Sequence, residues 1–274
     1  MLGAIYGDKA GSIYEHNQLK KIKSINPEKL ILPNSFYSDD TIETIAIIDA
    51  IINSKDYETT LKKYVLENIN YKPNFEPYFQ TSFSPGTISW AKGVGKNTRS
   101  SNGAMMRISP VGYLFKSEQE VRENAYLATI TSHNSKEAIE STTIIALLIY
   151  YFRNGYTKEE TFQKLNLSAK YKPFLKFNTT CHETLNNCLV AIYNSSSFED
   201  AIRKTLLMGG DTDTNCCIVG SVVEALYGMN KRQKEDAIKD LPNNYIKVLK
   251  KHINNIFSII VIIIIFLNLK NYFN

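Results

Sequence analysis

The sequence predicts an all-α domain, and three observations favour that fold class. Apolar residues recur at the three- and four-residue spacing of a helix face, most clearly in residues 45–52, 139–149 and 218–226. Alternating strand patterns bounded by hairpin turns are scarce. Residues 72–104 and 208–214, rich in Gly, Asn, Ser and Pro, are expected to form the loops that carry the polar chemistry.

Composition indicates an ordinary globular protein. The chain has 274 residues, 43% of them apolar and 22% charged, which is enough for one sizeable core. Lys and Arg exceed Asp and Glu by 32 to 27, but they are scattered, so we expect no nucleic-acid partner. The four cysteines lack C-x-x-C spacing and no secretory signal precedes them, which speaks against a zinc site and disulfides. A reducing, cytoplasmic setting is therefore expected.

The first group of candidate functional residues is the acidic cluster Ser38-Asp39-Asp40-Thr41, just before the helical stretch 41–52. The backbone N–H groups and dipole of a helix start tolerate concentrated negative charge. An isolated Asp-Asp-Thr at such a place is usually a helix cap. This cluster alone therefore leaves capping and metal ligation open.

A second acidic cluster, Asp211-Thr212-Asp213-Thr214, again precedes a helical stretch and follows two glycines. Four carboxylates gathered in one place repel one another unless cations neutralise them, and all-oxygen ligands suit hard ions such as Mg²⁺ or Mn²⁺. The pair of clusters therefore predicts a dinuclear metal site. The alternative is two unrelated capped helices.

The last stretch is apolar almost without a break from Ile256 to Leu267. It is shorter than the roughly 20 residues that a membrane-spanning helix needs. We therefore expect one domain over residues 1–255, followed by a non-spanning apolar extension over residues 256–274. A tail anchor or a partner-binding helix is the alternative interpretation of that extension.

Five segments in chain order resemble the ADP-ribosylglycohydrolase family, which includes the enzyme that reactivates ADP-ribosylated dinitrogenase reductase. Each segment is short, but the ordered set is specific and spans most of residues 1 to about 250. The segments are Gly3 to Glu15, Ser38 to Thr41, Ser101 to Gly112, Thr131 to Ala138, and Gly209 to Thr214.

The resemblance implies a compact orthogonal helical bundle with a central pair of Mg²⁺ ions and a cleft for ADP-ribose above them. Carried over position by position, it implies six protein ligands. Ser38 stands where the family usually has threonine; it keeps the hydroxyl oxygen but loses the methyl group that stiffens the rotamer. The implied ligands are Ser38, Asp39, Asp40, Asp211, Asp213 and Thr214.

The resemblance also implies substrate contacts. Glu15 resembles a family glutamate near the metals and the ribose, although glutamates are mostly surface residues. His133 resembles a histidine that contacts the diphosphate or distal ribose, although a lone histidine is more often structural. An Asn-Gly pair is by itself most often a turn. By resemblance the substrate loop comprises Arg99, Ser100, Ser101, Asn102 and Gly103.

Several nearby residues are interpreted structurally. We expect Arg107 to be an internal ion-pair anchor, and we interpret Asp8 as a brace for the N-terminal helix that lies outside the site. Cys216 and Cys217 are expected to pack in the core. The segment 177–185 resembles a family loop near the cleft.

The predicted activity is metal-dependent hydrolysis of the bond at C1 of the proximal ribose, which releases ADP-ribose from a modified protein or small adduct. Asp39 and Asp40 are the candidates to orient or deprotonate the attacking water, with Glu15 closing over the substrate. Which carboxylate is the base stays open, as does the acceptor, and a monomer is expected. The alternatives are a catalytically silent ADP-ribose binder on the same fold and a dinuclear phosphoester hydrolase.

Overall fold

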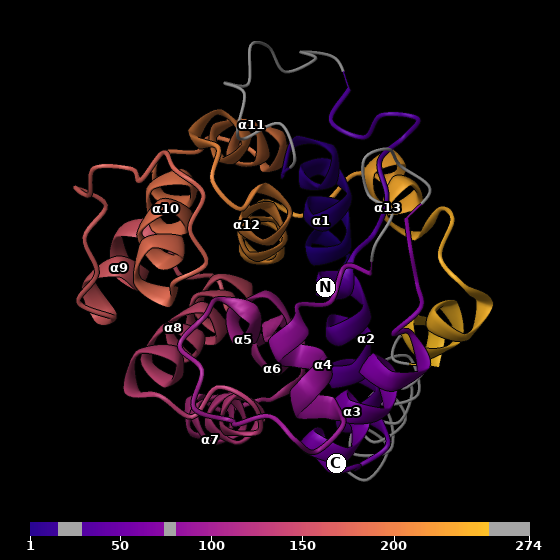
Figure 1. The fold of residues 1–274 in the computed structure, drawn as a ribbon. Helices are drawn as coiled ribbons and strands as arrows, with labels where there is room; N and C mark the ends of the chain where they lie inside the picture. The colour runs from indigo at the N-terminus through magenta and orange to yellow at the C-terminus, as the bar shows by residue number, and fades with distance from the viewer. Residues whose placement is uncertain (16–28, 74–80, 252–274) are drawn as a thin grey trace, which may run out of the picture.

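The structure is a computed structural model that describes residues 1–15, 29–73 and 81–251. In that part of the chain the regular elements are helices, with two isolated β-bridges and no strand, so the all-α prediction is confirmed (Figure 1). The named helices are α1 (Leu2–Glu15), α2 (Asp39–Ile52), α3 (Tyr57–Glu67), α4 (Pro85–Ala91), α5 (Gly103–Met106), α6 (Ser109–Leu114), α7 (Glu118–Ile130), α8 (Lys136–Arg153), α9 (Lys158–Lys164), α10 (Cys181–Tyr193), α11 (Phe198–Met208), α12 (Thr212–Tyr227) and α13 (Lys231–Ile238).

Helix α12 lies at the centre of the bundle and packs against α1, α8, α10 and α11 (Figure 1). Twelve of its residues are buried, from Thr212 to Val223. A helix buried on all sides needs apolar or small residues around its whole circumference. Cys216 and Cys217 are fully buried on this helix, and the expectation that they pack in the core is confirmed.

Helices α1 and α12 run antiparallel with their backbones in contact, because glycines recur every four residues on the facing side of α1. A Cβ atom built at Gly3 would lie 2.2 Å from the carbonyl oxygen of Gly220. At Gly7 it would lie 1.9 Å from the carbonyl oxygen of Cys216, and at Gly11 2.2 Å from that of Thr212. Only glycine permits this approach. It brings the residues beside these glycines, including Asp8 and Asp213, close together.

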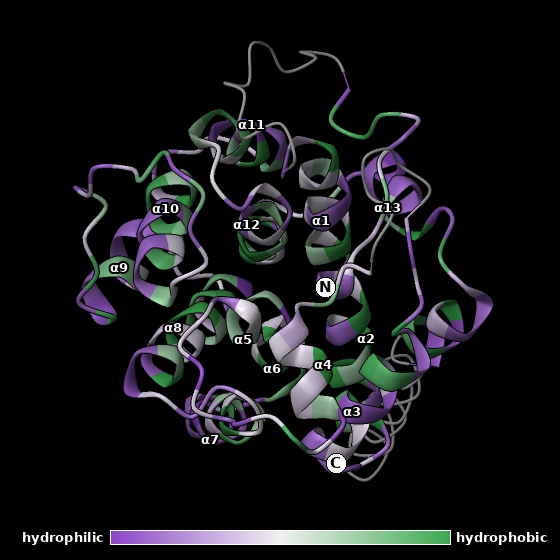
Figure 2. Ribbon diagram, viewed as in Figure 1, coloured by the Kyte–Doolittle hydropathy of each residue, from purple (hydrophilic) through white to green (hydrophobic). Residues whose placement is uncertain are grey.

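Helix α13 is drawn almost entirely in the hydrophilic colour in Figure 2. It is joined to α1 by the buried ammonium of Lys9, which donates to the carbonyl oxygens of Asp236 (2.6 Å) and Lys239 (2.9 Å). The C-terminal carbonyls of a helix are its negative end, so they suit a cation. A hydrophilic helix is thereby held without a large apolar face.

The loop prediction for residues 72–104 is wrong in part, because α4 lies inside that range. Ser84 caps this helix by accepting from the N–H of Thr87, and Pro85 occupies its first turn. The indole of Trp90 is buried and donates to the carbonyl of Thr131 at 2.7 Å. The second predicted loop, 208–214, is shorter than expected, since α11 ends at Met208 and α12 begins at Thr212.

The predicted apolar extension, residues 256–274, lies outside the described residues. Within the described ranges, no helix has both the length and the apolar character needed to cross a bilayer.

Candidate functional site

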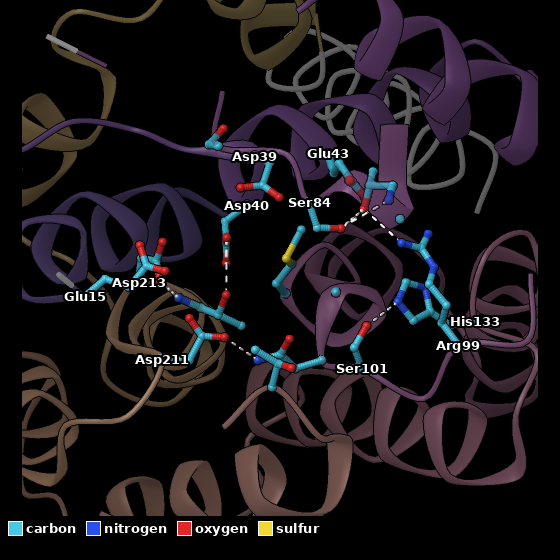
Figure 3. A pocket seen from close by; sticks show the side chains of 18 of the residues that line it. Glu15, Asp39, Asp40, Glu43, Ser84, Arg99, Ser101, His133, Asp211 and Asp213 are labelled. Atoms are coloured by element: carbon cyan, nitrogen blue, oxygen red, sulfur yellow. Dashed lines mark hydrogen bonds between the residues drawn. The ribbon is translucent and has the colours of Figure 1, made fainter. Parts of the chain in front are cut away.

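A cavity of about 320 Å³ lies where the starts of α2 and α12 face the end of α1. Figure 3 shows Glu15, Asp211 and Asp213 on one side of it and Arg99, Ser101 and His133 on the other. Of the predicted site residues, eleven line this cavity: Glu15, Asp39, Asp40, Arg99, Ser101, Asn102, Gly103, His133, Asp211, Asp213 and Thr214.

Two predicted residues are not in the cavity lining. Ser38 is buried behind it and acts as the N-cap of α2, with its Oγ accepting from the N–H of Asp40 at 3.2 Å. Ser100 is exposed at the surface, and its carbonyl accepts from the N–H of Cys181 at 3.2 Å. The predicted substrate loop therefore presents Ser101 to the cavity rather than Ser100.

Helix α2 begins two residues earlier than the sequence pattern predicts, at Asp39. Asp39 and Asp40 therefore lie in its first turn, where the free N–H groups and the positive end of the helix dipole stabilise negative charge. The cap itself is Ser38, which leaves both carboxylates free of the capping role.

Asp8 is the residue that sequence reasoning assigned wrongly, because it braces α2 rather than its own helix. Its carboxylate accepts from the N–H (2.9 Å) and Oγ (2.8 Å) of Ser38. It also accepts from the N–H (3.1 Å) and the hydroxyl of Thr41. Four hydrogen bonds use the roughly four acceptor sites of a carboxylate. Asp8 thus fixes the acidic turn through Ser38 and Thr41. This role follows from the tertiary position of Asp8 and has no signal in the sequence around it.

The two acidic clusters meet, so they are not two unrelated caps. Oδ2 of Asp40 lies 3.2 Å from Oγ of Ser38 and 3.3 Å from Oγ1 of Thr214. The carboxylate of Asp211, at the N-cap position of α12, makes no capping hydrogen bond. It accepts instead from Nδ2 of Asn102 at 2.7 Å, which ties the predicted substrate loop to the second acidic cluster.

Carboxylate oxygens gather in two overlapping groups. Those of Asp8, Asp40 and Asp213 lie within 4.8 Å of one another, as do those of Glu15, Asp211 and Asp213. Asp213 belongs to both groups and lies between them. In the first group the acceptor sites of Asp8 are used by hydrogen bonds, whereas Oδ1 of Asp40 has no partner.

Electrostatics in this part of the cavity are unfavourable for bare carboxylates. Burial, followed by the nearby charges of Asp213 and Asp8, raises the pKa of Glu15 to about 9. Burial raises the pKa of Asp211 to about 6, with Glu15 adding to the shift. Burial and neighbouring carboxylates also raise the pKa values of Asp40 and Asp213 well above normal. The group therefore needs either protons or cations.

The chemistry of the donor set fits cations. Oδ1 of Asp40 and Oε2 of Glu15 are buried and have no hydrogen-bond partner. An unpaired buried carboxylate oxygen is costly, and a hard divalent ion is the partner that an all-oxygen set of acids and hydroxyls suits. The residues present are therefore compatible with Mg²⁺ or Mn²⁺.

The opposite wall carries hydrogen-bond donors. Arg99 donates through Nη1 to Oγ1 of Thr87 (2.9 Å), while its Nη2 is buried and has no partner. His133 is 3% exposed, and its Nε2 lies 2.9 Å from Oγ of Ser101. A side chain at Gly103 would meet that ring at 3.3 Å.

Behind this wall Arg107 pairs with Glu43, both almost fully buried, so the prediction of an internal ion-pair anchor is confirmed.

Sequence reasoning missed part of the cavity lining. Phe177 and Thr179 belong to the segment that resembles a family loop, but the stretch around α4 was interpreted only as loop. The Ser84-Pro85 start of α4 was the available signal for the residues of that helix. The missed lining residues are Glu43, Ser82, Ser84, Gly86, Thr87 and Met106.

Fold and cavity together define a class: an all-α protein with a buried carboxylate wall facing a wall of hydrogen-bond donors. The family model for ADP-ribosylglycohydrolases matches residues 1–258. The chain therefore belongs to the ADP-ribosylglycohydrolase family.

Individual relatives are distant. ADP-ribosylarginine hydrolase Tri1 of Pseudomonas putida (strain GB-1) is 24% identical over 159 residues, which cover 52% of this chain and 42% of that protein. The same-named protein of Serratia proteamaculans (strain 568) is 24% identical over 48% of this chain and 40% of its own. The chain thus matches less than half the length of either relative.

Human ADP-ribosylhydrolase ARH3 is 20% identical over 84% of this chain and 85% of its own. A solved structure titled ADP-ribosylglycohydrolase-related protein complex superposes with a TM-score of 0.61 at 19% identity, over 90% of both chains. That likeness supports the fold.

Proposed function

We propose that this chain is a metal-dependent hydrolase that removes ADP-ribose from a modified acceptor. Water adds to C1 of the proximal ribose, the bond from C1 to the acceptor nitrogen or oxygen breaks, and the acceptor leaves with a proton. Membership of the family and the hydrolase names of its relatives support the reaction class. The acceptor is a protein side chain or a small adduct, and the proposed setting is cytoplasmic.

One observation carries the proposal: unpaired, buried oxygens of Asp40 and Glu15 face donors across one cavity. The acidic wall suits cations and a ribose, whereas the donor wall of Arg99, Ser101 and His133 suits anionic phosphate oxygens. A ligand that is a phosphate ester at one end and a sugar at the other matches both walls.

The proposed ligands for two Mg²⁺ ions, with Mn²⁺ as a substitute, come from both acidic clusters. When bound, such ions lower the pKa of a coordinated water and polarise the sugar oxygens. Asp39 and Asp40 orient the attacking water, and Glu15 holds a ribose hydroxyl at the edge of the acidic wall. The proposed ligand set is Ser38, Asp39, Asp40, Asp211, Asp213 and Thr214.

The decisive experiment incubates the purified chain with ADP-ribosylated proteins and Mg²⁺ and follows free ADP-ribose. We expect release that stops with EDTA and falls at least 100-fold in Asp40→Asn and Asp213→Asn, within the roughly 10²–10⁴-fold contribution of a positioned acid–base group. Asp240→Asn is the matched control, because Asp240 is exposed and Asn tolerates its positive φ of 67°. It should keep full activity.

Two outcomes would contradict the proposal. Tight ADP-ribose binding without release, unchanged in Asp40→Asn, indicates a catalytically silent binder. Release of AMP in place of intact ADP-ribose indicates a phosphoester hydrolase.

A further inference from the structure

A chain of hydrogen bonds crosses the donor wall from the buried ion pair to the cavity. Nη2 of Arg107 donates to Oγ of Ser132 at 2.6 Å. Oγ of Ser132 lies 2.7 Å from Nδ1 of His133, and Nε2 of His133 lies 2.9 Å from Oγ of Ser101. Ser101 lines the cavity, whereas Ser132 is completely buried. Both ring nitrogens of His133 therefore face hydroxyl groups, and either group can donate or accept.

The proton positions along this chain follow from its fixed end. An arginine guanidinium only donates, and Glu43 keeps Arg107 oriented. Ser132 therefore accepts from Arg107 and has one proton left to place. The Oγ of Ser132 has hydrogen bonds to Arg107 and to Nδ1 of His133, and of these two partners Nδ1 can accept the proton. With Nδ1 accepting, a neutral ring carries its proton on Nε2, which donates to Ser101.

The opposite arrangement leaves a buried group unsatisfied. If Nδ1 carried the proton, Ser132 would accept from both Arg107 and His133, and its own hydroxyl proton would face no acceptor. A buried unsatisfied donor costs about 1–3 kcal/mol. A doubly protonated ring is also disfavoured, since burial and the cations Arg107 and Arg99 lower the pKa of His133 well below its usual value.

We propose that Arg107 and Ser132 are positioning residues that hold His133 as the neutral Nε2–H tautomer and so turn Ser101 into a hydrogen-bond donor toward the cavity. Because the Oγ of Ser101 already accepts from His133, its hydroxyl proton is free for a ligand. Ser101 therefore favours a ligand oxygen that accepts a hydrogen bond, such as a phosphate or ether oxygen. The identity of that ligand as ADP-ribose rests on the proposed function.

The charge of Arg107 stays away from the cavity, although its hydrogen bonds affect the group that faces the ligand. The guanidinium of Arg107 stays buried against Glu43, and its donor character reaches the cavity through two hydroxyls and a neutral ring. Ser101 thereby adds a neutral donor to the wall beside the charged donor Arg99, whose Nη2 has no partner.

The first test reads the tautomer directly in the unaltered protein. The chain is labelled with ¹⁵N-histidine, and the signal of His133 is assigned by its loss in His133→Gln, since the chain has four histidines. We expect Nδ1 to resonate as an unprotonated acceptor and Nε2 as an N–H. A protonated Nδ1, or a doubly protonated ring at neutral pH, overturns the proposal.

The second test is a double-mutant cycle on ADP-ribose affinity. Ser101→Ala should weaken binding about fivefold, the size of one net hydrogen bond. Ser132→Ala should weaken it about two- to fivefold, because the tautomer is no longer fixed. The double variant should bind as Ser101→Ala does, since Ser132 acts only through Ser101. If the two fold-losses in affinity multiply in the double variant, or if Ser132→Ala loses no affinity, Ser132 does not act through Ser101 and the proposal is contradicted.

Ser221→Ala is the matched control, because Ser221 is equally buried and its Oγ donates to the carbonyl of Ile218 at 2.7 Å. Its ADP-ribose affinity should equal that of the unaltered chain. If the unaltered chain fails to bind ADP-ribose, the proposed function fails, whereas the tautomer is still decided by the ¹⁵N spectrum.

Discussion

The carboxylate of Asp8 accepts four hydrogen bonds from the two residues that flank Asp39 and Asp40. It is fully buried, and burial raises its pKa while those four hydrogen bonds lower it. At the residue scale, the direction in which the acidic turn points therefore depends on an acid whose acceptor sites are used by hydrogen bonds to that turn.

Asp8→Asn tests this role. The amide oxygen would take the place of Oδ2 and accept from the N–H groups of Ser38 and Thr41 without the negative charge. The amide nitrogen would stand where Oδ1 now accepts from the hydroxyl of Ser38, and that hydrogen bond would be lost. We expect a loss of about 2 kcal/mol or more in the free energy of unfolding, from lost hydrogen bonds to a charged group. Mg²⁺ affinity, measured by calorimetry, should fall at least tenfold as the turn moves.

Asp56→Asn is the control for Asp8→Asn, since Asp56 caps α3 and asparagine caps nearly as well. It should change stability by less than about 0.5 kcal/mol. Unaltered Mg²⁺ affinity in Asp8→Asn would show that the acidic turn holds its shape without this brace.

At the scale of elements, the contact between α1 and α12 positions the acidic wall. Gly7 and Gly11 allow the two backbones to touch, and Thr212 donates from its hydroxyl to the carbonyl of Gly11 at 3.0 Å. Gly11 and Thr212 are 201 positions apart in the chain. This contact brings the braced start of α2, through Asp8, against the start of α12.

Gly7→Ala should therefore be severely destabilising. The added Cβ would lie 1.9 Å from a backbone carbonyl that cannot move alone, so the helices must separate. Overpacking costs typically about 1–3 kcal/mol, and a backbone clash belongs at or above the upper end. Urea denaturation measures the loss.

The control for Gly7→Ala is Gly86→Ala in α4, where the Cβ atom would find its nearest neighbour, Nη1 of Arg99, at 3.4 Å. Its stability should stay level or rise slightly, because alanine favours helix. Equal stability in the two variants would mean that α1 and α12 tolerate a wider spacing.

At the scale of the whole molecule, three segments that meet only in the folded chain supply the acidic wall: the end of α1, the start of α2 and the start of α12. Their carboxylates repel one another, and the pKa values of Glu15, Asp40 and Asp213 are raised accordingly. A cation that binds this arrangement binds the folded state and not the unfolded one.

Mg²⁺ should therefore raise the melting temperature. At a free concentration 100 times its Kd, a ligand of the folded state adds about 2.7 kcal/mol. For a chain of this size that corresponds to roughly 5 °C or more. Asp213→Asn should lose most of the shift, because Asp213 belongs to both carboxylate groups. NaCl at matched ionic strength is the control, and an equal shift with NaCl would mean that general screening accounts for the effect.

Much of the fold and part of the site follow from local patterns. Helical spacing predicted the long helices that became α2, α8 and α12, because a buried face repeats with the period of the helix. The acidic motifs predicted that two helix starts share one place, and their oxygens do meet at 3.3 Å. The prediction was poorer for α4, whose apolar residues are too few to show a period.

The sequence by itself determined the all-α class and the oxygen-rich character of the acidic wall, because periodicity and motif are properties of neighbouring residues. The tertiary structure alone decided that Asp8 braces α2, that Ser101 rather than Ser100 faces the cavity, and that Arg107 reaches it through Ser132 and His133. Each of these depends on which helices approach each other and how closely. The approach of α1 to α12 is a sum of packing contacts over the whole molecule, which no single stretch of the chain contains.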